Sequence, residues 1–160
     1  MGIGATDLRQ YIIGPTLKNL NLWSLAAENL LLGTAAQESK LGSYLHQING
    51  PALGLYQIEP NTHSDLWENF LNFRPQLSAL VRGLVPSSFN VNDSVFELIW
   101  NLSYATAIAR LIYDRIPAAL PDADDIQGLG AYWKQYYNTS NGAGDVGQFV
   151  ENYQNLIHGQ

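Results

Sequence analysis

Apolar side chains recur at separations of three and four between residues 20 and 38, which is the spacing of one face of an α-helix. The positions on this face are Leu20, Trp23, Ala27, Leu30, Leu31, Thr34, Ala35 and Glu38. The pattern predicts a helix from Asn21 to about Lys40, ended by Gly42. Glu38 therefore lies on the inward face, whereas Glu28 is rotated about 100° away from that face and is predicted to be an ordinary surface carboxylate.

Further segments with helical spacing are separated by prolines and polar turns, and they predict a mainly α fold of about seven helices. They cover approximately residues 7–19 with an interruption near Gly14-Pro15, 62–73, 76–85, 93–116, 122–137 and 145–158, with a polar linker at 87–91 and a turn at 141–144. Residues 93–116 contain no internal Gly or Pro, so we expect them to form the longest, central helix. Residues 42–60 are rich in Gly and Pro and predict an irregular loop with a short β-hairpin.

The composition narrows the range of ligands. The 160 residues are 46% hydrophobic, which predicts one domain over residues 1–160 with a continuous core. Charged residues make up only 14%, below the roughly 25% of average soluble domains, and Tyr, Trp, Asn and Gln are plentiful, so the surface suits uncharged, hydroxylated ligands such as sugars. The net charge of -6 works against binding to nucleic acid or to an anionic membrane.

Several classes of site and location are disfavoured by what the sequence lacks. There is no cysteine, so disulfides, thiolate catalysis and zinc-thiolate sites are excluded. The three histidines, His46, His63 and His158, lack the helical spacing of a two-histidine metal site, and we expect no metal and no cofactor. The first ten residues do not form a secretory signal, and the apolar segment 22–36 is too short to span a membrane. We therefore expect no membrane insertion, and we expect a monomer.

Three short motifs occur in a fixed order along the chain. Glu38-Ser39 ends the first strong helix pattern, Gly54-Leu55-Tyr56-Gln57 follows in the loop with Pro60 behind it, and Ala131-Tyr132 lies in a later helix. In order and spacing these motifs resemble the lysozyme-like superfamily, and within it the goose-type lysozymes and soluble lytic transglycosylases that include many phage wall-degrading enzymes. Trp133 departs from the family pattern, because Asn usually follows the Ala-Tyr pair. The motifs span residues 30 to 140, nearly the whole domain.

The resemblance implies a cleft between a helical lobe and a small irregular lobe, and cleavage of the MurNAc-GlcNAc β-1,4 bond of bacterial peptidoglycan. Glu38 would be the general acid, since burial keeps a carboxyl protonated near neutral pH; the alternative is a structural hydrogen bond. Gln57 would pair with an acetamido or hydroxyl group, or would pin its own loop. Tyr132 would hold the Glu38 carboxyl through its phenol, or would only pack in the core.

The remaining candidates are neighbours of these motifs. Ser39 is expected to orient the helix end or the loop rather than to act as a nucleophile. Tyr56 replaces the commoner Met and presents a flat face to a sugar ring or packs inside the loop. Glu59 lies two residues beyond Gln57, so in an extended segment both side chains point to the same side, where Glu59 could activate water; the alternative is a loop-bracing Glu. His63 either lines the cleft or is solvated at a helix start.

Three functions stay open on this evidence. The first is a lytic transglycosylase, in which the muramoyl 6-hydroxyl attacks internally, Glu38 acts as acid and then base, and 1,6-anhydro-MurNAc ends form. The second is a hydrolytic muramidase that uses water, with or without Glu59. The third is a non-catalytic glycan-binding or virion structural module. Without an export signal, a wall-degrading protein would have to be delivered by another factor such as a holin, or as part of a virion.

Overall fold

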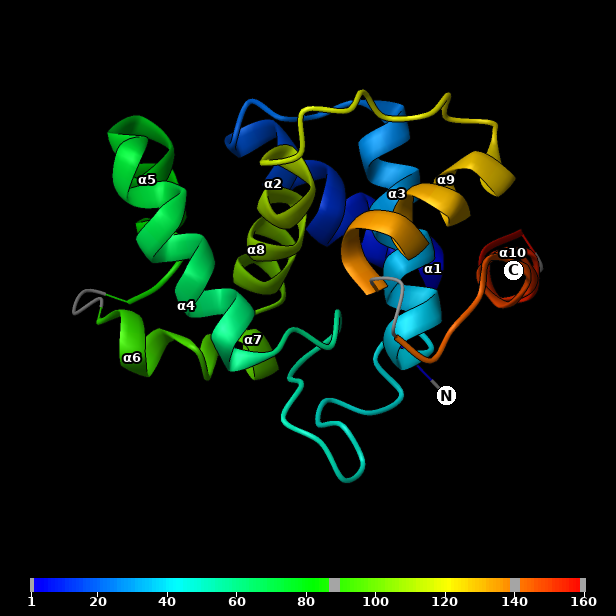
Figure 1. Cartoon of the computed structure of the whole chain (residues 1–160), viewed down its shortest axis with the longest axis horizontal. Coiled ribbons are helices and arrows are strands. Elements are labelled where there is room, and N and C mark those ends of the chain that lie inside the picture. The colour runs from blue at the N-terminus through cyan, green and yellow to red at the C-terminus, as the bar shows by residue number, and fades with distance from the viewer. Residues whose placement is uncertain (1, 87–89, 139–141, 159–160) are drawn as a thin grey trace.

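The computed structural model describes residues 2–86, 90–138 and 142–158, and within them the chain is almost entirely helical (Figure 1). No β-strand occurs in these segments; two isolated antiparallel bridges, His46 with Leu53 and Leu53 with Ile58, are the only β-pairing there. The mainly α class is therefore confirmed, and the predicted hairpin is reduced to these bridges. None of the described helices is both long and apolar enough to cross a membrane.

The helices follow one another in a simple order. The α-helices are α1 (Ala5–Asp7), α2 (Gly14–Asn19), α3 (Leu25–Ser39), α4 (Pro60–Asn69), α5 (Pro75–Arg82), α6 (Val91–Ser94), α7 (Glu97–Trp100), α8 (Leu102–Asp114), α9 (Ile126–Trp133) and α10 (Val146–Tyr153). Three π-helical turns, Leu8–Ile13, Lys134–Asn138 and Gln154–His158, and one 3-10 turn, Leu71–Phe73, extend them. Of the predicted linker at 87–91 and turn at 141–144, residues 87–89 and 141 lie outside the described residues.

Helices α3 and α8 lie at the centre of the molecule (Figure 1). Helices α4 and α5 lie beyond α8 on one side, and α9 and α10 pack on α3 on the other. The loop between α3 and α4 runs below both groups in this view. Nearly all of α3 is buried, including both sides of the helix, because α9, α10, α8 and the first π-helical turn surround it. A side chain at the end of α3 is therefore held by several neighbouring elements.

The prediction of one helix over residues 93–116 was wrong. The chain leaves helical geometry at Asn101, with φ -100° and ψ 91°, and α7 and α8 are separate helices. The Asn101 side chain accepts from the Tyr104 amide at 3.0 Å and donates to the Leu84 carbonyl at 2.8 Å. Asparagine is a preferred N-cap residue, and its bonds to the backbone compete with a continuous helix. Among the described helices α3, with 15 residues, is the longest.

The beginning of α3 also differs from its prediction. The helix begins at Leu25, because Ser24 is an extended N-cap whose side chain accepts from the Ala27 amide. Trp23 precedes the helix and is 47% exposed. At the N-terminus, Pro15 does not interrupt the helical path as predicted; it lies in the first turn of α2, directly after a π-helical turn that ends with the Gly14 N–H donating to the Arg9 carbonyl.

Glu28 was predicted to be a surface carboxylate, and this was wrong. It is only 7% exposed and is paired with Arg9, whose Nη1 lies 2.5 Å from Oε1. The Trp23 indole donates to its second oxygen at 2.7 Å. Helical periodicity showed correctly that Glu28 does not face the same way as Glu38, but the N-terminal helices cover this second face of α3 as well. Because a buried carboxylate needs partners, its burial depends on Arg9 and Trp23.

Helix α3 ends in a tight reversal that starts the loop. Lys40, Leu41 and Gly42 all have left-handed backbones, with φ of 50°, 56° and 81°. The predicted stop at Gly42 agrees with this C-terminus, since a left-handed residue just past a helix is the usual way of ending it. Further along, Gly54 has φ 74°, and a side chain there would overlap the carbonyl oxygen of Leu98. The turn at 54–57 therefore packs directly against the backbone of α7.

Candidate functional site

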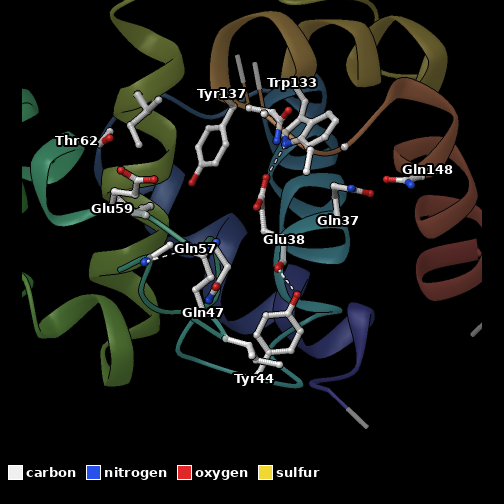
Figure 2. A pocket seen from close by; sticks show the side chains of 18 residues that line it. Gln37, Glu38, Tyr44, Gln47, Gln57, Glu59, Thr62, Trp133, Tyr137 and Gln148 are labelled. Carbon is white, nitrogen blue, oxygen red and sulfur yellow. Dashed lines mark hydrogen bonds between the residues drawn. The ribbon is translucent and has the colours of Figure 1, made fainter. Parts of the chain in front are cut away.

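A cleft of about 720 Å³ lies where the end of α3 meets the loop. Its walls come from the last turn of α3, the loop 44–59, the first turn of α4, Ile112 of α8, the end of α9 with the π-helical turn after it, and the start of α10 with the residues before it. Figure 2 shows Glu38 in the middle of this space, with loop and α4 side chains on one side and α10 on the other. Most lining groups are uncharged amides, hydroxyls and aromatic rings.

Glu38 carries the clearest chemical signature in the cleft. Burial raises the pKa of its carboxyl from 4.5 to about 7, and a hydrogen bond from Trp133 works in the opposite direction. In that bond the Trp133 indole Nε1 donates to Glu38 Oε1 at 2.9 Å. A carboxyl that titrates near neutral pH can both give and take a proton there, which is the property that general acid–base catalysis requires.

The Trp133 ring is rigidly held, so it fixes the position of the Glu38 carboxyl. It is fully buried and stacks on Phe149 of α10, with ring centroids 5.5 Å apart. Gly144 lies against the edge of its six-membered ring, and a Cβ at that position would be 2.7 Å from Cη2. Any side chain at position 144 would therefore require the indole or the backbone to shift.

Tyr137 approaches the same carboxyl from the π-helical turn (Figure 2). Its hydroxyl donates to the Tyr56 carbonyl at 2.7 Å, which joins this turn to the loop, and its ring stacks on Tyr113 at 5.2 Å. Burial, and next the negative charge of Glu38, raise the pKa of Tyr137 well above 10. The phenol is therefore a neutral group at physiological pH, and its ring contributes to the surroundings that disfavour ionised Glu38.

Two hydroxyl groups tie the loop to the end of α3. The Tyr44 hydroxyl donates to the backbone carbonyl of Glu38 at 2.7 Å. Ser39 Oγ donates to the Leu55 carbonyl at 2.6 Å and accepts from the Gly42 amide at 2.8 Å. These bonds set the distance between Glu38 and the opposite wall of the cleft. Ser39 is fully buried, so it contacts the loop and not a ligand, as the loop-orienting prediction requires.

Gln57 lines the cleft on the loop side. Its backbone has φ 47°, unusual for a residue other than Gly, and both its backbone N–H and its side-chain Nε2 donate to the Gly54 carbonyl, at 3.1 and 2.8 Å. Since one N–H of the amide holds the turn, the carbonyl oxygen and the second N–H of this side chain are left for a ligand. The two predicted roles of Gln57 are thus compatible with each other.

Glu59 is the second carboxylate of the cleft. It is exposed and precedes α4, and Figure 2 shows it with Thr62 on the wall opposite Glu38. Within the described residues its carboxylate forms no hydrogen bond or ion pair, so the prediction of a loop-bracing Glu receives no supporting side-chain contact. Its position in the cleft keeps open a role in handling water or a ligand.

The structure places Tyr132 and Tyr56 in their packing alternative rather than at the acid or at a ligand. The Tyr132 hydroxyl donates to the Ala118 carbonyl at 2.8 Å, and Trp133, the next residue on α9, holds Glu38 instead. Successive helical residues are rotated by about 100°, so only one of the two can face the cleft. Tyr56 is fully buried, with its hydroxyl 3.0 Å from Thr106 Oγ1, and offers no face to a sugar.

His63 was expected at the cleft or in solvent, and it is in neither place. It is fully buried on α4, with Nε2 2.8 Å from the Tyr104 hydroxyl. Its Nδ1 is buried without a hydrogen-bond partner among the described residues. Burial lowers the pKa of the imidazole from 6.5 to about 4, so it is neutral at pH 7.

Sequence reasoning missed Trp133 and Tyr137 as site residues. Trp133 was noted only as a departure from a motif, although its place directly after Ala131-Tyr132 was the available signal. Tyr137 had no signal, because its approach to the cleft depends on the π-helical turn. Comparison with models of known protein families, with curated proteins and with solved structures found no match for this chain.

Proposed function

We propose that this protein cleaves the MurNAc-GlcNAc β-1,4 bond of peptidoglycan, with Glu38 as the general acid. The observation that carries the proposal is the Glu38 carboxyl itself, which lies in a cleft lined by neutral polar groups, has a pKa of about 7, and is aimed by the Trp133 indole. Glycoside cleavage needs a carboxylic acid that is still protonated near neutral pH beside the leaving oxygen. Glu38 is the cleft carboxyl that meets this requirement.

In the first step Glu38 gives its proton to the bridging oxygen as the bond from the MurNAc anomeric carbon to that oxygen breaks. The leaving GlcNAc departs with a new hydroxyl group, and positive charge develops at the anomeric carbon. The Glu38 carboxylate formed in this step is the anion nearest to that positive charge, and the hydrogen bond from the Trp133 indole stabilises the carboxylate. A pKa of about 7 leaves a substantial protonated fraction to start the next cycle.

In the second step, a lytic transglycosylase is the favoured outcome. The MurNAc 6-hydroxyl attacks the anomeric carbon, its proton returns to Glu38, and a 1,6-anhydro ring closes without consumption of water. This route needs a single carboxyl, which acts first as the acid and then as the base. The structure favours it because Glu38 is fixed by hydrogen bonds, whereas Glu59 is exposed and has no described partner to orient it.

Hydrolysis is the second candidate, and the position of Glu59 is the observation that favours it. Its carboxylate lies on the wall opposite Glu38, where a base could activate water on the other side of a bound sugar. Mass spectrometry of the products separates the two reactions, since a hydrolysed end is heavier than an anhydro end by one water. Glu59→Gln should leave anhydro products unchanged in a transglycosylase and should strongly slow a hydrolase that uses this base.

The decisive experiment is digestion of purified sacculi with matched variants. Wild type and Glu68→Gln, a change at an exposed Glu outside the cleft, should release soluble fragments. Glu38→Gln should abolish release and still sediment with sacculi, because the amide keeps the shape of the site but cannot supply the proton. Release by Glu38→Gln would refute the catalytic assignment. Binding without release by the wild-type protein would support a glycan-binding module instead.

A further inference from the structure

The wall of the cleft formed by α3 and α10 has a feature that the acid step does not use. Gln37 precedes Glu38 on α3, and its Oε1 accepts a hydrogen bond from Asn152 Nδ2 of α10 at 2.7 Å. Gln148, also from α10, lines the same wall and points toward Gln37 in Figure 2. An amide beside the acid is therefore fixed in orientation by a second helix.

This fixed orientation leaves the amide nitrogen of Gln37 as the free group. Its oxygen is engaged by Asn152, and no hydrogen bond of its Nε2 is found within the described residues. Gly144 lies close beside Nε2, since a Cβ there would be 3.1 Å from this nitrogen and 2.7 Å from the Trp133 ring. Because Gln37 lines the cleft, the wall offers an N–H donor in the residue next to Glu38.

The charges of the cleft limit what this donor can bind. Among the described lining residues there is no Lys, Arg or His, while Glu38 and Glu59 are both acids. An anionic group would be repelled by these carboxylates and would find no cation to compensate. The natural partner is a neutral acceptor, and the strongest neutral acceptor on an amino sugar chain is the carbonyl of an acetamido substituent, ahead of its hydroxyl and ether oxygens.

The opposite wall carries a second amide. Gln57 uses one N–H of its Nε2 to hold the Gly54 carbonyl, so its carbonyl oxygen and its second N–H are left for a ligand. Figure 2 shows Gln57 and Gln37 on opposite sides of Glu38. A glycan in the cleft therefore meets the oriented Gln37 donor on the α3–α10 wall and an amide that can accept or donate on the loop wall. The Gln37 donor favours sugars that present an acceptor toward α10.

We infer that Gln37 Nε2 donates a hydrogen bond to the acetamido carbonyl of a sugar beside the cleaved bond, so that this wall selects uncharged, N-acetylated glycans. The inference rests on the proposed function for the position of the cleaved bond. Asn152 is a positioning residue, since it acts on the ligand through the Gln37 amide.

The test measures binding without turnover. In the Glu38→Gln background, titration calorimetry compares a chitin oligosaccharide with its de-N-acetylated counterpart at high salt, which screens attraction of the free amines to Glu59. Gln37→Met keeps the side-chain shape and removes the donor. It should weaken binding of the acetylated oligosaccharide roughly three- to tenfold, which corresponds to the loss of one neutral hydrogen bond. Binding of the de-N-acetylated oligosaccharide should be unchanged. Gln127→Met, at an exposed position outside the cleft, is the matched control.

Asn152→Asp provides an independent second variant. A carboxylate only accepts hydrogen bonds, so it should turn the Gln37 amide round and bring the oxygen toward the ligand. The same selective loss of binding to the acetylated oligosaccharide is expected, with an unchanged circular dichroism spectrum. Once Gln37→Met is added, Asn152→Asp should cause no further loss.

Three results would overturn the inference. Gln37→Met could leave the affinity for the acetylated oligosaccharide unchanged, or the acetylated oligosaccharide could fail to bind at all. Equal weakening of binding for both oligosaccharides would indicate that a hydroxyl is the partner of Gln37. Failure of the proposed function gives a different result, because wild type would then release nothing from sacculi while the Gln37 effect on binding persisted. Release from sacculi without a Gln37 effect would keep the proposed reaction and refute the acetamido contact.

Discussion

Glu38 is a residue whose surroundings favour its uncharged form, and this has a consequence for stability. The folded pKa of about 7 is above the ordinary 4.5, so the folded protein holds this proton more tightly than the unfolded chain does. The resulting stabilisation is fully present below pH 4.5 and is lost as the pH rises to 7. Glu38→Gln should therefore be more stable than wild type by about 3 kcal/mol at pH 8, with little difference at pH 4. Urea unfolding at the two pH values measures this, and equal stabilities at pH 8 would contradict it.

Trp133 tunes the same carboxyl, and its replacement should shift the pH dependence of activity. The indole hydrogen bond lowers the Glu38 pKa, so Trp133→Phe should raise that pKa further. The alkaline limb of kcat/KM, which reports loss of the acid's proton, should move up by as much as about one pH unit. Trp23→Phe removes an indole donor from Glu28 outside the cleft and is the matched control. An unchanged or downward-shifted limb in Trp133→Phe would show that the indole does not tune this acid.

The site residues differ in how far the sequence could predict them. Glu38 follows from helical periodicity, because its own helix fixes which way it faces. The short motifs located the segments that carry Gln57 and Trp133. Choosing Trp133 over Tyr132 required the rotation of α9 about its axis, which depends on packing against Phe149 and not on local pattern. The burial of Tyr56 likewise depends on Thr106, fifty residues away in the chain.

At the scale of elements, helices were predictable where one apolar face dominates, and their ends were not. The apolar positions from 95 to 116 recur at helical spacing, so periodicity alone predicted a continuous helix. Asn101 ends that continuity because its side chain caps α8 and also donates to the Leu84 carbonyl. The second contact comes from a segment outside the helix, and no local pattern shows it. Capping residues inside an apolar repeat were the available signal.

The break between α7 and α8 depends on Asn101, and its replacement should show this. Asn101→Ala removes the cap and leaves the Leu84 carbonyl without its donor, at a cost of about 2 kcal/mol in the free energy of unfolding. Asn101→Ser keeps a capping oxygen and should cost about half as much. Urea unfolding of the two variants beside wild type provides the measurement. Equal stability of Asn101→Ala and wild type would mean that this cap is not needed for the break.

At the scale of the whole molecule, the cleft is made by contacts between distant segments. The Trp133–Glu38 bond joins residues 95 apart in sequence, and the Gln37–Asn152 bond joins residues 115 apart. The mainly α class and the irregular loop followed from composition and periodicity, which are local properties. The assembly of α3, the loop, α9 and α10 around one carboxyl depends on long-range packing, so the parts were predictable from the sequence and their arrangement was not.

Buried His63 should dominate the acid sensitivity of the fold. Its folded pKa of about 4 is below the ordinary 6.5, so the unfolded chain binds the proton more tightly and stability is lost as the pH falls from 6.5 to 4. The full effect is about 3 kcal/mol, because the charged imidazole would be buried against Tyr104 with its Nδ1 unpaired. His63→Gln cannot titrate and should flatten the stability profile in this window, whereas His46→Gln, at an exposed position, should retain the wild-type slope. Thermal melting between pH 4 and 7 measures both, and a slope in His63→Gln as steep as in wild type would assign the acid sensitivity to other groups.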